Sequence, residues 1–465
     1  MAQLKERPKP FILPDYCKGC GRCIEACVRK CITEGNTINP GTGLIPVVLN
    51  LEQCTACGLC IQACPEPFAL QATPSGGVNE KDPISLYGGR RRTAPVPKPI
   101  PDTVVPLPAT EPLVTKGSYA SAIGALLAGC RHFFGYPITP STEGAELMAK
   151  LLPKLDGIFQ QAVSEVATVN MMYGCSGAGL RGMTFTSSPG FSLMLEGISY
   201  MIGAELPGVF VNVMRGGPGL GNIAPEQSDI KLACHGLGHG NTKAIVLAPS
   251  TPQEMLDLTM LAFKLSFQYR NPVIVLGDGY LGQMTGKVNL PKTMVKPGIP
   301  EWAVYGDENH RRNLICSFFL SETELSDHNL SLIAKYEKMW KDEQRVDRFH
   351  CDDADVLVIA TNTPARMAKG AVQDLRKQGI KAGLYRPITV WPFPIDELKP
   401  LLGRARCLVV VEASDGQLEN ELRLALSHAR VGANLPIHHV RTYGGHLPQQ
   451  FDIAEKVASL KEVRP

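Results

Sequence analysis

Eight cysteines in the first part of the chain have the residue type and spacing of iron–sulfur ligands. They form two runs of the pattern C-x2-C-x2-C-x3-C, in which the fourth cysteine of each run binds the other of two 4Fe-4S clusters. The predicted ligands of the first cluster are Cys17, Cys20, Cys23 and Cys64. The predicted ligands of the second cluster are Cys54, Cys57, Cys60 and Cys27. Two such clusters carry electrons, so the rest of the chain has to explain the source of those electrons.

Other uses of these cysteines fit less well. A structural zinc site takes four ligands, and zinc sites rarely present eight cysteines in two such triplets. Gly19, Gly21 and Gly58 let the backbone approach the inorganic sulfides of a cluster. A proline follows the last cysteine of the second run, whereas Val28 follows that of the first. The other seven of the 15 cysteines are scattered singly, which suits reduced thiols in a cytoplasm, and Cys31 is expected to be a small core residue.

Composition excludes several classes of function. The chain has 465 residues, enough for roughly three domains. Its net charge of +3 gives no electrostatic argument for nucleic-acid binding. The first ten residues are polar and lysine-rich and do not resemble a signal peptide. No segment approaches the run of about 20 apolar residues that a membrane-spanning helix requires, so we expect a cytoplasmic protein without a membrane span.

Changes in composition divide the chain into five parts. Residues 1–72 form the cluster domain, and 73–112 are a proline-rich linker that favours an extended tether. Residues 113–300 form a larger α/β domain, 301–352 a connector that is helical over 322–348, and 353–465 a smaller α/β domain. In both α/β domains short β-rich runs alternate with helical segments, which predicts parallel sheets covered by helices on both faces. Reactive groups of such sheets gather at the carboxyl ends of the strands.

Three polar groups at predicted strand ends or helix starts are candidates for chemistry. The loop 135–143 places two prolines and three hydroxyl side chains before a helix. Its hydroxyls either cap that helix, through Ser141 or Thr142, or form an anion site suited to a carboxylate. Glu165 opens a helix of small and apolar residues, where a carboxylate ordinarily interacts with the helix dipole. Arg215 opens a glycine-rich loop after a buried strand and offers a planar fork to a carboxylate.

Two motifs are misleading. Residues 177–182 match G-x-G-x-x-G, but they follow a helix and precede a strand, the reverse of a dinucleotide fingerprint. Gly277-Asp278-Gly279 resembles the start of the thiamine diphosphate–magnesium motif, but no asparagine stands in a suitable place after it. We therefore expect no diphosphate–magnesium site within this chain.

Taken together, these motifs resemble the alpha subunits of the 2-oxoacid:ferredoxin oxidoreductase family over about residues 114–450. The loop 214–225, with 277–283, is most similar to the branched-chain (2-oxoisovalerate) members. The family usually carries its ferredoxin-like clusters on a small separate subunit or elsewhere in a fused chain, so fusion at the N-terminus is a departure. The resembling stretches are 135–143, 164–165, 187–194, 215–227 and 385–394.

The resemblance implies a fold and a set of site residues. The fold is a ferredoxin-like 2×(4Fe-4S) domain, a thiamine-enzyme pyrimidine-type parallel α/β domain and a smaller transketolase C-terminal-like α/β domain. Thiamine diphosphate with Mg²⁺ is shared with a partner beta subunit, and Glu165 hydrogen-bonds the aminopyrimidine ring nitrogen. Ser164, Pro137 and Thr139 are the other implied cofactor contacts. Thr139 is the first candidate for contacting the substrate carboxylate and Arg215 the second.

The implied reaction is the oxidative decarboxylation of a 2-oxoacid with coenzyme A, giving an acyl-CoA and carbon dioxide. Electrons pass through the clusters to ferredoxin or another acceptor, and a gamma subunit or domain assists with coenzyme A. Two alternatives stay open. The substrate is 2-oxoglutarate or an aryl 2-oxoacid such as phenylglyoxylate, or the chain is a non-catalytic electron-transfer and assembly subunit.

Overall fold

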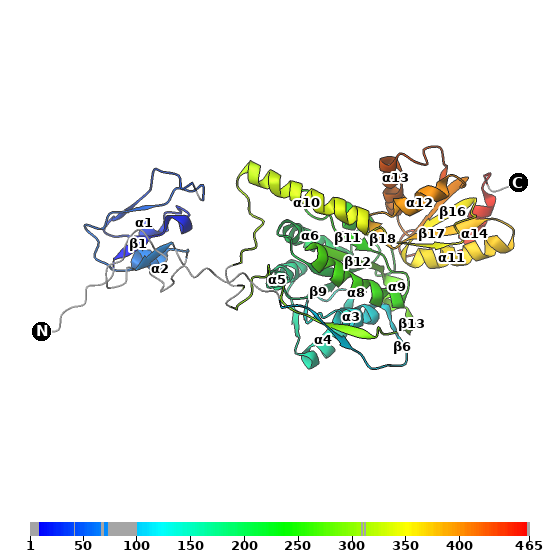
Figure 1. The fold of residues 1–465 in the computed structure, drawn as a ribbon, viewed down its shortest axis with the longest axis horizontal. Coiled ribbons are helices and arrows are strands. Elements are labelled where there is room, and N and C mark those ends of the chain that lie inside the picture. Colours follow the sequence, from blue (N-terminus) through cyan, green and yellow to red (C-terminus); the bar gives the residue numbers. More distant parts are fainter. Residues whose placement is uncertain are drawn as a thin grey trace. The chain divides into compact units, whose positions relative to one another are not determined.

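A computed structural model describes residues 9–40, 42–66, 69–72, 100–307, 310 and 313–462. The chain divides into two compact units, residues 1–95 and 96–465 (Figure 1). Residues 73–99, most of the predicted linker, lie outside the described part. No helix in the described ranges has the length and apolar character needed to cross a membrane.

The first unit is built from two similar halves. Each half has a short helix that is entered through a glycine in the left-handed conformation, Gly21 (φ 76°) before α1 and Gly58 (φ 80°) before α2. A side chain is disfavoured at such a φ, which explains the glycine after the second cysteine of each run. The elements are β1 (Pro10–Ile12) paired antiparallel with β4 (Leu70–Ala72), β2 (Ile32–Thr33) paired antiparallel with β3 (Val48–Leu49), α1 (Arg22–Ala26) and α2 (Leu59–Ala63).

The larger unit contains a seven-stranded sheet with the strand order β18-β11-β12-β10-β9-β7-β8. All neighbours in it are parallel except β18, which pairs antiparallel with β11. Every residue of β9, β10 and β12 is buried, as expected for strands covered on both faces. The strands of the parallel part are β7 (His132–Gly135), β8 (Ile158–Gln161), β9 (Gly182–Thr186), β10 (Gly208–Met214), β11 (Ile245–Leu247) and β12 (Pro272–Asp278).

Helices cover both faces of this sheet, α3, α4 and α8 on one and α5 and α6 on the other (Figure 1). The small residues of α3 allow close packing: a Cβ on Gly124 would lie 2.5 Å from the carbonyl oxygen of Leu256 in α8. The strand β9 ends at Thr186, and Ser188 begins α6. The helices are α3 (Gly117–Leu127), α4 (Thr142–Leu151), α5 (Glu165–Gly177), α6 (Ser188–Gly203), α7 (Ile230–His235), α8 (Pro252–Tyr269) and α9 (Gly279–Gln283).

The strand order reverses between β7 and β9, because β8 lies on the outer side of β7 whereas the chain then continues on the other side of it. Such a switch point opens a crevice at the carboxyl ends of the strands, where open α/β sheets bind their ligands. The loops that follow β7, β8, β9 and β10 all begin at this edge.

Part of the segment expected to be a tether belongs to the larger unit. The strand β5 (Thr103–Pro106) pairs antiparallel with β14 (Thr293–Lys296), and β6 (Leu113–Lys116) with β13 (Thr285–Val288). The buried Arg181 guanidinium donates to Asp102 at 2.5 Å and fixes the start of this segment. Proline-rich chain is extended and suits an edge strand, so composition alone does not distinguish it from a free linker.

A second sheet of five strands follows, with the order β15-β17-β16-β19-β20 and only β15 antiparallel. The predicted helix over 322–348 ends early, at Asp342 of α10 (Glu322–Asp342), and 346–349 form β15. The remaining elements are β15 (Val346–Phe349), β16 (Val356–Ala360), α11 (Asn362–Lys377), β17 (Ala382–Pro387), α12 (Ile395–Leu402), β19 (Cys407–Glu412), α13 (Gln417–Ala429), β20 (Ile437–Arg441) and α14 (Gln450–Ser459).

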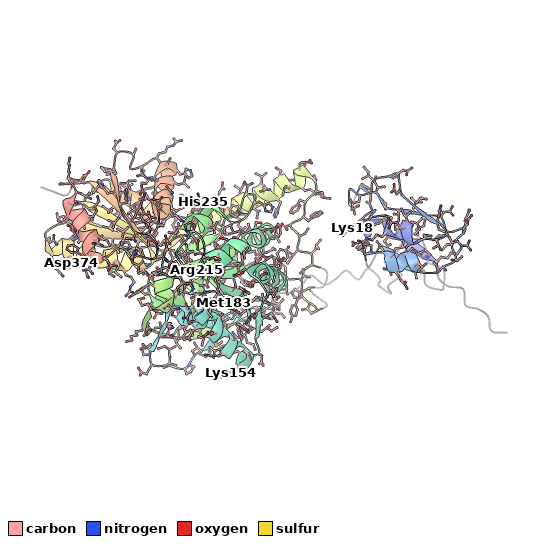
Figure 2. The ribbon with its side chains drawn as sticks, turned by 180° about the vertical axis from the view of Figure 1, so that it is seen from behind. Lys18, Lys154, Met183, Arg215, His235 and Asp374 are labelled. Carbon is pink, nitrogen blue, oxygen red and sulfur yellow. The ribbon has the colours of Figure 1, made fainter. Side chains whose placement is uncertain are left out.

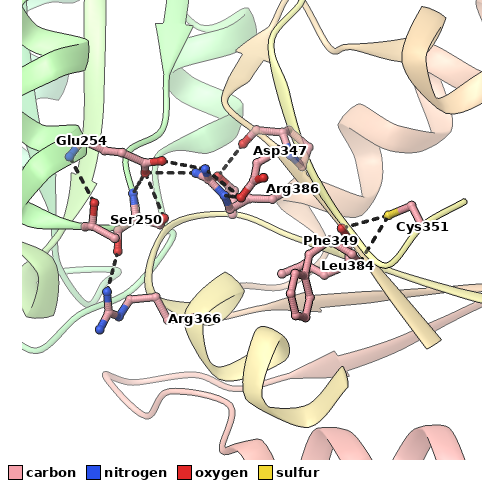
Figure 3. Close-up of polar contacts among 11 residues, drawn as sticks. Ser250, Glu254, Asp347, Phe349, Cys351, Arg366, Leu384 and Arg386 are labelled. Atoms are coloured by element: carbon pink, nitrogen blue, oxygen red, sulfur yellow. Dashed lines mark hydrogen bonds and ion pairs between the residues drawn. The ribbon is translucent and has the colours of Figure 1, made fainter. Parts of the chain in front are cut away.

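Two features join the second sheet to the first. After β17 the chain crosses over as β18 (Thr389–Trp391) and adds an edge strand to the first sheet. The buried Arg386 donates to Glu254 of α8 at 2.6 Å and to Asp347 of β15 at 3.3 Å (Figure 3). A buried guanidinium needs such paired carboxylates, so this contact holds the two sheets in a fixed arrangement.

Candidate active site and electron-transfer centres

The thiols of the first unit fall into two groups of neighbours. Burial raises the pKa of the Cys23 thiol to about 11, and the electrostatic neighbours that raise it further are Cys17, Cys64 and Cys20. Cys64 belongs to the second cysteine run, yet it lies with three cysteines of the first. This is the group predicted to hold the first cluster.

The other four predicted ligands line one cavity, together with Cys31. Burial raises the pKa of the Cys60 thiol, and Cys27 and Cys54 are the neighbouring thiols that raise it. Cys31 is buried, as expected, and its backbone N–H donates to the Cys27 sulfur at 3.3 Å. Among the described residues, no three His, Cys, Asp or Glu side chains converge as closely as a single metal ion requires. A cavity walled by four thiols fits a cluster.

Backbone N–H groups point at the sulfurs in both halves. The N–H of Gly19 donates to the Cys17 sulfur at 3.5 Å, and that of Ala56 to the Cys54 sulfur at 3.4 Å. Both donors are left-handed residues, with φ of 65° and 53°. Hydrogen bonds to sulfur tune the potential of an iron–sulfur cluster, so this feature suits electron transfer.

Glu165 is the first residue of α5 and lies at the carboxyl edge of the first sheet. The side chain of Ser164 caps this helix by accepting from the Ala167 N–H at 3.2 Å. The glutamate is only 5% exposed, and no described residue hydrogen-bonds or ion-pairs with its carboxylate. A buried carboxylate without a partner is costly, so this one suits a donor that the protein itself does not supply.

Gly190, in the first turn of α6, makes room for this carboxylate. A Cβ placed on Gly190 would lie 2.5 Å from Glu165 Oε1 and 2.5 Å from Thr186 Oγ1. Sequence reasoning did not single out Gly190 as a site residue. The available signal was a proline and a glycine directly after a buried strand, a sign of a close approach to the backbone.

The loop after β7 carries Pro137 and Thr139, both exposed, and a cis peptide bond between Thr139 and Pro140. The predicted helix cap differs in detail. Ser141 precedes α4, but its hydroxyl donates back to the Ile138 carbonyl at 2.7 Å and does not accept from the helix. The loop is therefore closed on itself, and the hydroxyl of Thr139 stays at the surface.

Arg215 follows β10 and lies inside the larger unit (Figure 2). The side chain is buried, and its Nη1 donates to the carbonyl oxygen of Thr139 at 2.6 Å. The structure thus brings two of the predicted site residues into contact and places Glu165 at the same edge of the sheet. No hydrogen bond joins Glu165 to either of them in the described part of the chain.

Asp278, from the motif rejected above, has a structural role. Its carboxylate accepts from the Leu281 N–H at 2.9 Å, the Thr363 N–H at 2.9 Å and the Thr363 hydroxyl at 2.8 Å. The first bond caps α9 and the others join the start of α11. Burial raises the pKa of Asp278 and these hydrogen bonds lower it. Both carboxylate oxygens are already used within the chain.

Gln227 bridges the strand ends at the switch point of the second sheet. From the loop after β10 it donates from Nε2 to the Thr361 carbonyl at 3.2 Å and to Asn362 Oδ1 at 3.1 Å. Its Oε1 accepts from the Ala413 N–H at 2.9 Å. These partners follow β16 and β19, the strands between which the second sheet reverses its order.

The chain combines a domain whose cysteines are arranged for two clusters with an α/β fold that has a buried carboxylate at its switch point. This combination is that of an iron–sulfur oxidoreductase subunit with a thiamine-enzyme domain. Comparison with family models agrees. Residues 9–65 match a 4Fe-4S dicluster domain, and 354–453 match the pyruvate:ferredoxin oxidoreductase core domain II. Residues 123–314 match the thiamine diphosphate-binding domain of pyruvate flavodoxin/ferredoxin oxidoreductases.

The chain belongs to the 2-oxoacid:ferredoxin oxidoreductase family. It is 44% identical to ketoisovalerate oxidoreductase subunit VorB of Methanothermobacter thermautotrophicus over 346 residues, 74% of this chain and 96% of that one. It is 37% identical to 2-oxoglutarate synthase subunit KorA of Methanocaldococcus jannaschii, covering 66% and 90%. The solved 2-oxoglutarate:ferredoxin oxidoreductase of Magnetococcus marinus, with 2-oxoglutarate, coenzyme A and succinyl-CoA bound, has a TM-score of 0.68 at 26% identity. The match covers 76% of this chain and 66% of the chain in the solved structure.

Proposed function

We propose that this chain is the alpha-type subunit of a cytoplasmic complex that oxidises a 2-oxoacid with coenzyme A to an acyl-CoA and carbon dioxide. The observation that carries the proposal is the Glu165 carboxylate, buried at the switch point without a partner among the residues that the structure describes. A partner beta subunit and a gamma subunit or domain complete the enzyme. We propose domains over residues 1–72, 113–300 and 353–465, with a linker over 73–112 and a connector over 301–352. Residues 100–112 of the linker belong to the larger unit.

The role proposed for Glu165 is to control the protonation of the cofactor. Thiamine diphosphate, when bound, supplies the electron sink for decarboxylation. The carboxylate of Glu165 accepts a hydrogen bond from the aminopyrimidine ring nitrogen and keeps that nitrogen protonated. Gly190 leaves the space in which the carboxylate lies. Ser164 fixes the start of α5 and hence the position of Glu165.

Substrate recognition is assigned to the loop after β7. Pro137 forms part of its rigid wall, and the exposed hydroxyl of Thr139 is placed to donate to the substrate carboxylate. Arg215 is buried and donates from Nη1 to the Thr139 carbonyl oxygen, but its Nε has no hydrogen-bond partner in the described chain. This donor supports Arg215 as a second contact to the carboxylate.

The diphosphate and its Mg²⁺ are assigned to the beta subunit. The aspartate that would have been the magnesium ligand in this chain, Asp278, is fully buried and accepts three hydrogen bonds from its own chain. This supports a cofactor shared between two subunits.

The electrons leave through the first unit to ferredoxin or another acceptor. Its two thiol groups support the crossed assignment, with Cys64 in the first cluster and Cys27 in the second. The variant C64S should therefore lose the first cluster and C27S the second, each with about half of the iron and a different remaining paramagnetic signal. Identical residual signals from the two variants would contradict the crossed assignment.

The substrate proposed first is a branched-chain 2-oxoacid such as 2-oxoisovalerate, because the relative with 44% identity is named for ketoisovalerate. A specific observation also favours 2-oxoglutarate, since the KorA relatives and the solved structure are named for that substrate. The two candidates differ in the side chain, which ends in a carboxylate in 2-oxoglutarate and in two methyl groups in 2-oxoisovalerate, so assays must compare them directly.

The test is anaerobic copurification of the chain with its partner subunits, followed by assays with 2-oxoisovalerate, 2-oxoglutarate and phenylglyoxylate. Each assay contains coenzyme A and a low-potential dye as acceptor. We expect one 2-oxoacid to bleach the clusters and then support turnover that depends on coenzyme A. A complex with intact clusters that no 2-oxoacid reduces would overturn the proposal and favour an electron-transfer and assembly role.

A further inference from the structure

A polar network crosses the carboxyl ends of the strands beside the residues assigned above. Asp229, in the loop after β10, accepts from the Ser188 hydroxyl at 2.5 Å and from Asn212 Nδ2 at 2.9 Å. The Ser188 oxygen in turn accepts from the backbone N–H of Arg215 at 3.2 Å. Arg215 then donates from Nη1 to the carbonyl oxygen of Thr139 at 2.6 Å. The network therefore runs from Asp229 to the loop that follows β7.

The network lies in the protein interior, where hydrogen bonds to a charged group are strong. Asp229 is 6% exposed and Asn212 is fully buried. The Ser228 hydroxyl adds a second link, because it donates to the Arg215 carbonyl at 2.9 Å. A buried carboxylate has to keep its donors, so Asp229 fixes the rotamer of Ser188 and, through it, the backbone of Arg215.

The guanidinium of Arg215 shows that this network does more than connect two loops. The side chain is 8% exposed, yet its Nε atom is buried without any hydrogen-bond partner in the described chain. A purely structural arginine would be expected to use this donor, because a buried unsatisfied N–H is costly. The unused donor, next to the Thr139 loop, suits a ligand carboxylate.

We infer that Asp229 is a positioning residue for the site of the 2-oxoacid carboxylate. It acts through the Ser188 hydroxyl on Arg215 and through Arg215 on Thr139, and it does not contact the substrate. The inference rests on the proposed function, because that function assigns Thr139 and Arg215 to the substrate carboxylate. Its expected signature is a loss of 2-oxoacid affinity with the thiamine site unchanged.

The experiment uses D229N in the full chain, copurified with the partner subunits. Asparagine has the same shape but offers Ser188 a neutral acceptor. Since a displacement of about 1 Å in a reacting group costs on the order of 10²-fold in rate, we expect kcat/KM for the 2-oxoacid to fall by about 10- to 100-fold, mostly through KM. Iron content and the thiamine concentration that gives half-maximal activity should stay at wild-type values.

Two further variants keep the result interpretable. S188A removes the middle of the network without touching the carboxylate, and it should raise the same KM. The double variant S188A/D229N should be no worse than the more severe single variant, because both residues act in one chain of contacts. The control is D257N, which alters an exposed aspartate of α8 that accepts from Gln253 and does not contact the network. It should leave KM unchanged.

Wild-type KM in D229N and S188A would overturn the inference, as would additive losses in the double variant. If D229N does not fold, S188A alone decides. A complex that carries E165Q, assayed in parallel, distinguishes failure of the proposed function from failure of the role inferred for Asp229. Full turnover of E165Q would reject the proposed function, whereas an inactive E165Q beside a D229N with wild-type KM would reject only the role of Asp229.

Discussion

Glu165 and Asp278 are two buried carboxylates at helix starts on the same edge of the same sheet, and the chain treats them in opposite ways. Asp278 follows β12, caps α9 and accepts three hydrogen bonds from its own chain. Glu165 follows the β8 loop, begins α5 and accepts none from the described residues. Both side chains are at least nine-tenths buried. Their burial is similar, but Asp278 is the N-cap of α9 whereas Glu165 is the first residue of α5, after its cap Ser164, and their donors differ.

The difference separates a group that stabilises the fold from a group that is kept for a ligand. At Asp278, where α9 meets α11, several donors offset part of the desolvation cost, while burial still raises the pKa of the carboxyl. A buried charge without donors lowers stability and persists in proteins where it serves a function. Gly190 also keeps this site open, because any side chain there would overlap the position of the Glu165 carboxylate.

The largest effect is expected from E165Q. The amide keeps the shape of the side chain but cannot hold a proton on the aminopyrimidine nitrogen, so turnover should fall by about 10²- to 10⁴-fold. Because the carboxylate accepts no hydrogen bond from the described part of the chain, the unfolding temperature should be no lower than that of the wild type. Dye reduction by the assembled complex and scanning calorimetry measure the two quantities. A variant that is less stable yet turns over normally would reverse the assignment of the two carboxylates.

The opposite roles of these residues were only partly visible in the sequence. The cysteine spacing predicted two clusters, and the strand–helix alternation predicted a parallel α/β sheet; the family comparison confirms this fold class. Glu165 was found because it begins a helix of small and apolar residues within a stretch that resembles the family. These signals come from residues that are close together in the sequence, so they can be recognised without knowing the fold.

Contacts between distant residues were not readable. Thr363, one of the partners of Asp278, lies 85 residues further on at the start of α11, and β18 joins the first sheet directly after β17 of the second sheet. The network through Asp229 likewise joins loops from three strands. Nor did composition show that 103–106 pair with 293–296, because an extended proline-rich segment looks the same whether it is paired or free.

A smaller effect is expected from G190A. Its methyl group would lie 2.5 Å from Glu165 Oε1, so the carboxylate must move, and a displacement of about 1 Å costs on the order of 10²-fold in rate. The matched control is G174A, because Gly174 lies in α5 itself with open space around its Cβ position. That variant should keep full activity and gain about 0.5–1 kcal/mol of stability from helix propensity. Equal activity of the two variants would show that the carboxylate does not need its present position.

The variant D278N should affect stability and spare the chemistry. An amide nitrogen would replace one acceptor oxygen and leave at least one of the Leu281 and Thr363 donors unsatisfied, at a cost of about 1–3 kcal/mol. Calorimetry of the full chain should show this loss, while turnover per folded complex stays near the wild-type value. A stable but inactive D278N would mean that this carboxylate also serves the reaction, and the contrast with Glu165 would disappear.

The smallest effect is expected from S164A, and it tests how far the open carboxylate depends on its own helix. The Ser164 side chain accepts from the Ala167 N–H at 3.2 Å, and losing such a cap costs about 1 kcal/mol. T251A, which removes the equivalent bond to the Glu254 N–H at the start of α8, is the control and should cost about the same. If Ser164 also contributes to cofactor binding, S164A should raise the thiamine concentration needed for half-maximal activity, and T251A should not. Equal effects of the two variants on stability, with no change in thiamine dependence, would reduce Ser164 to a helix cap and leave Glu165 as the one group at the start of α5 that the cofactor contacts.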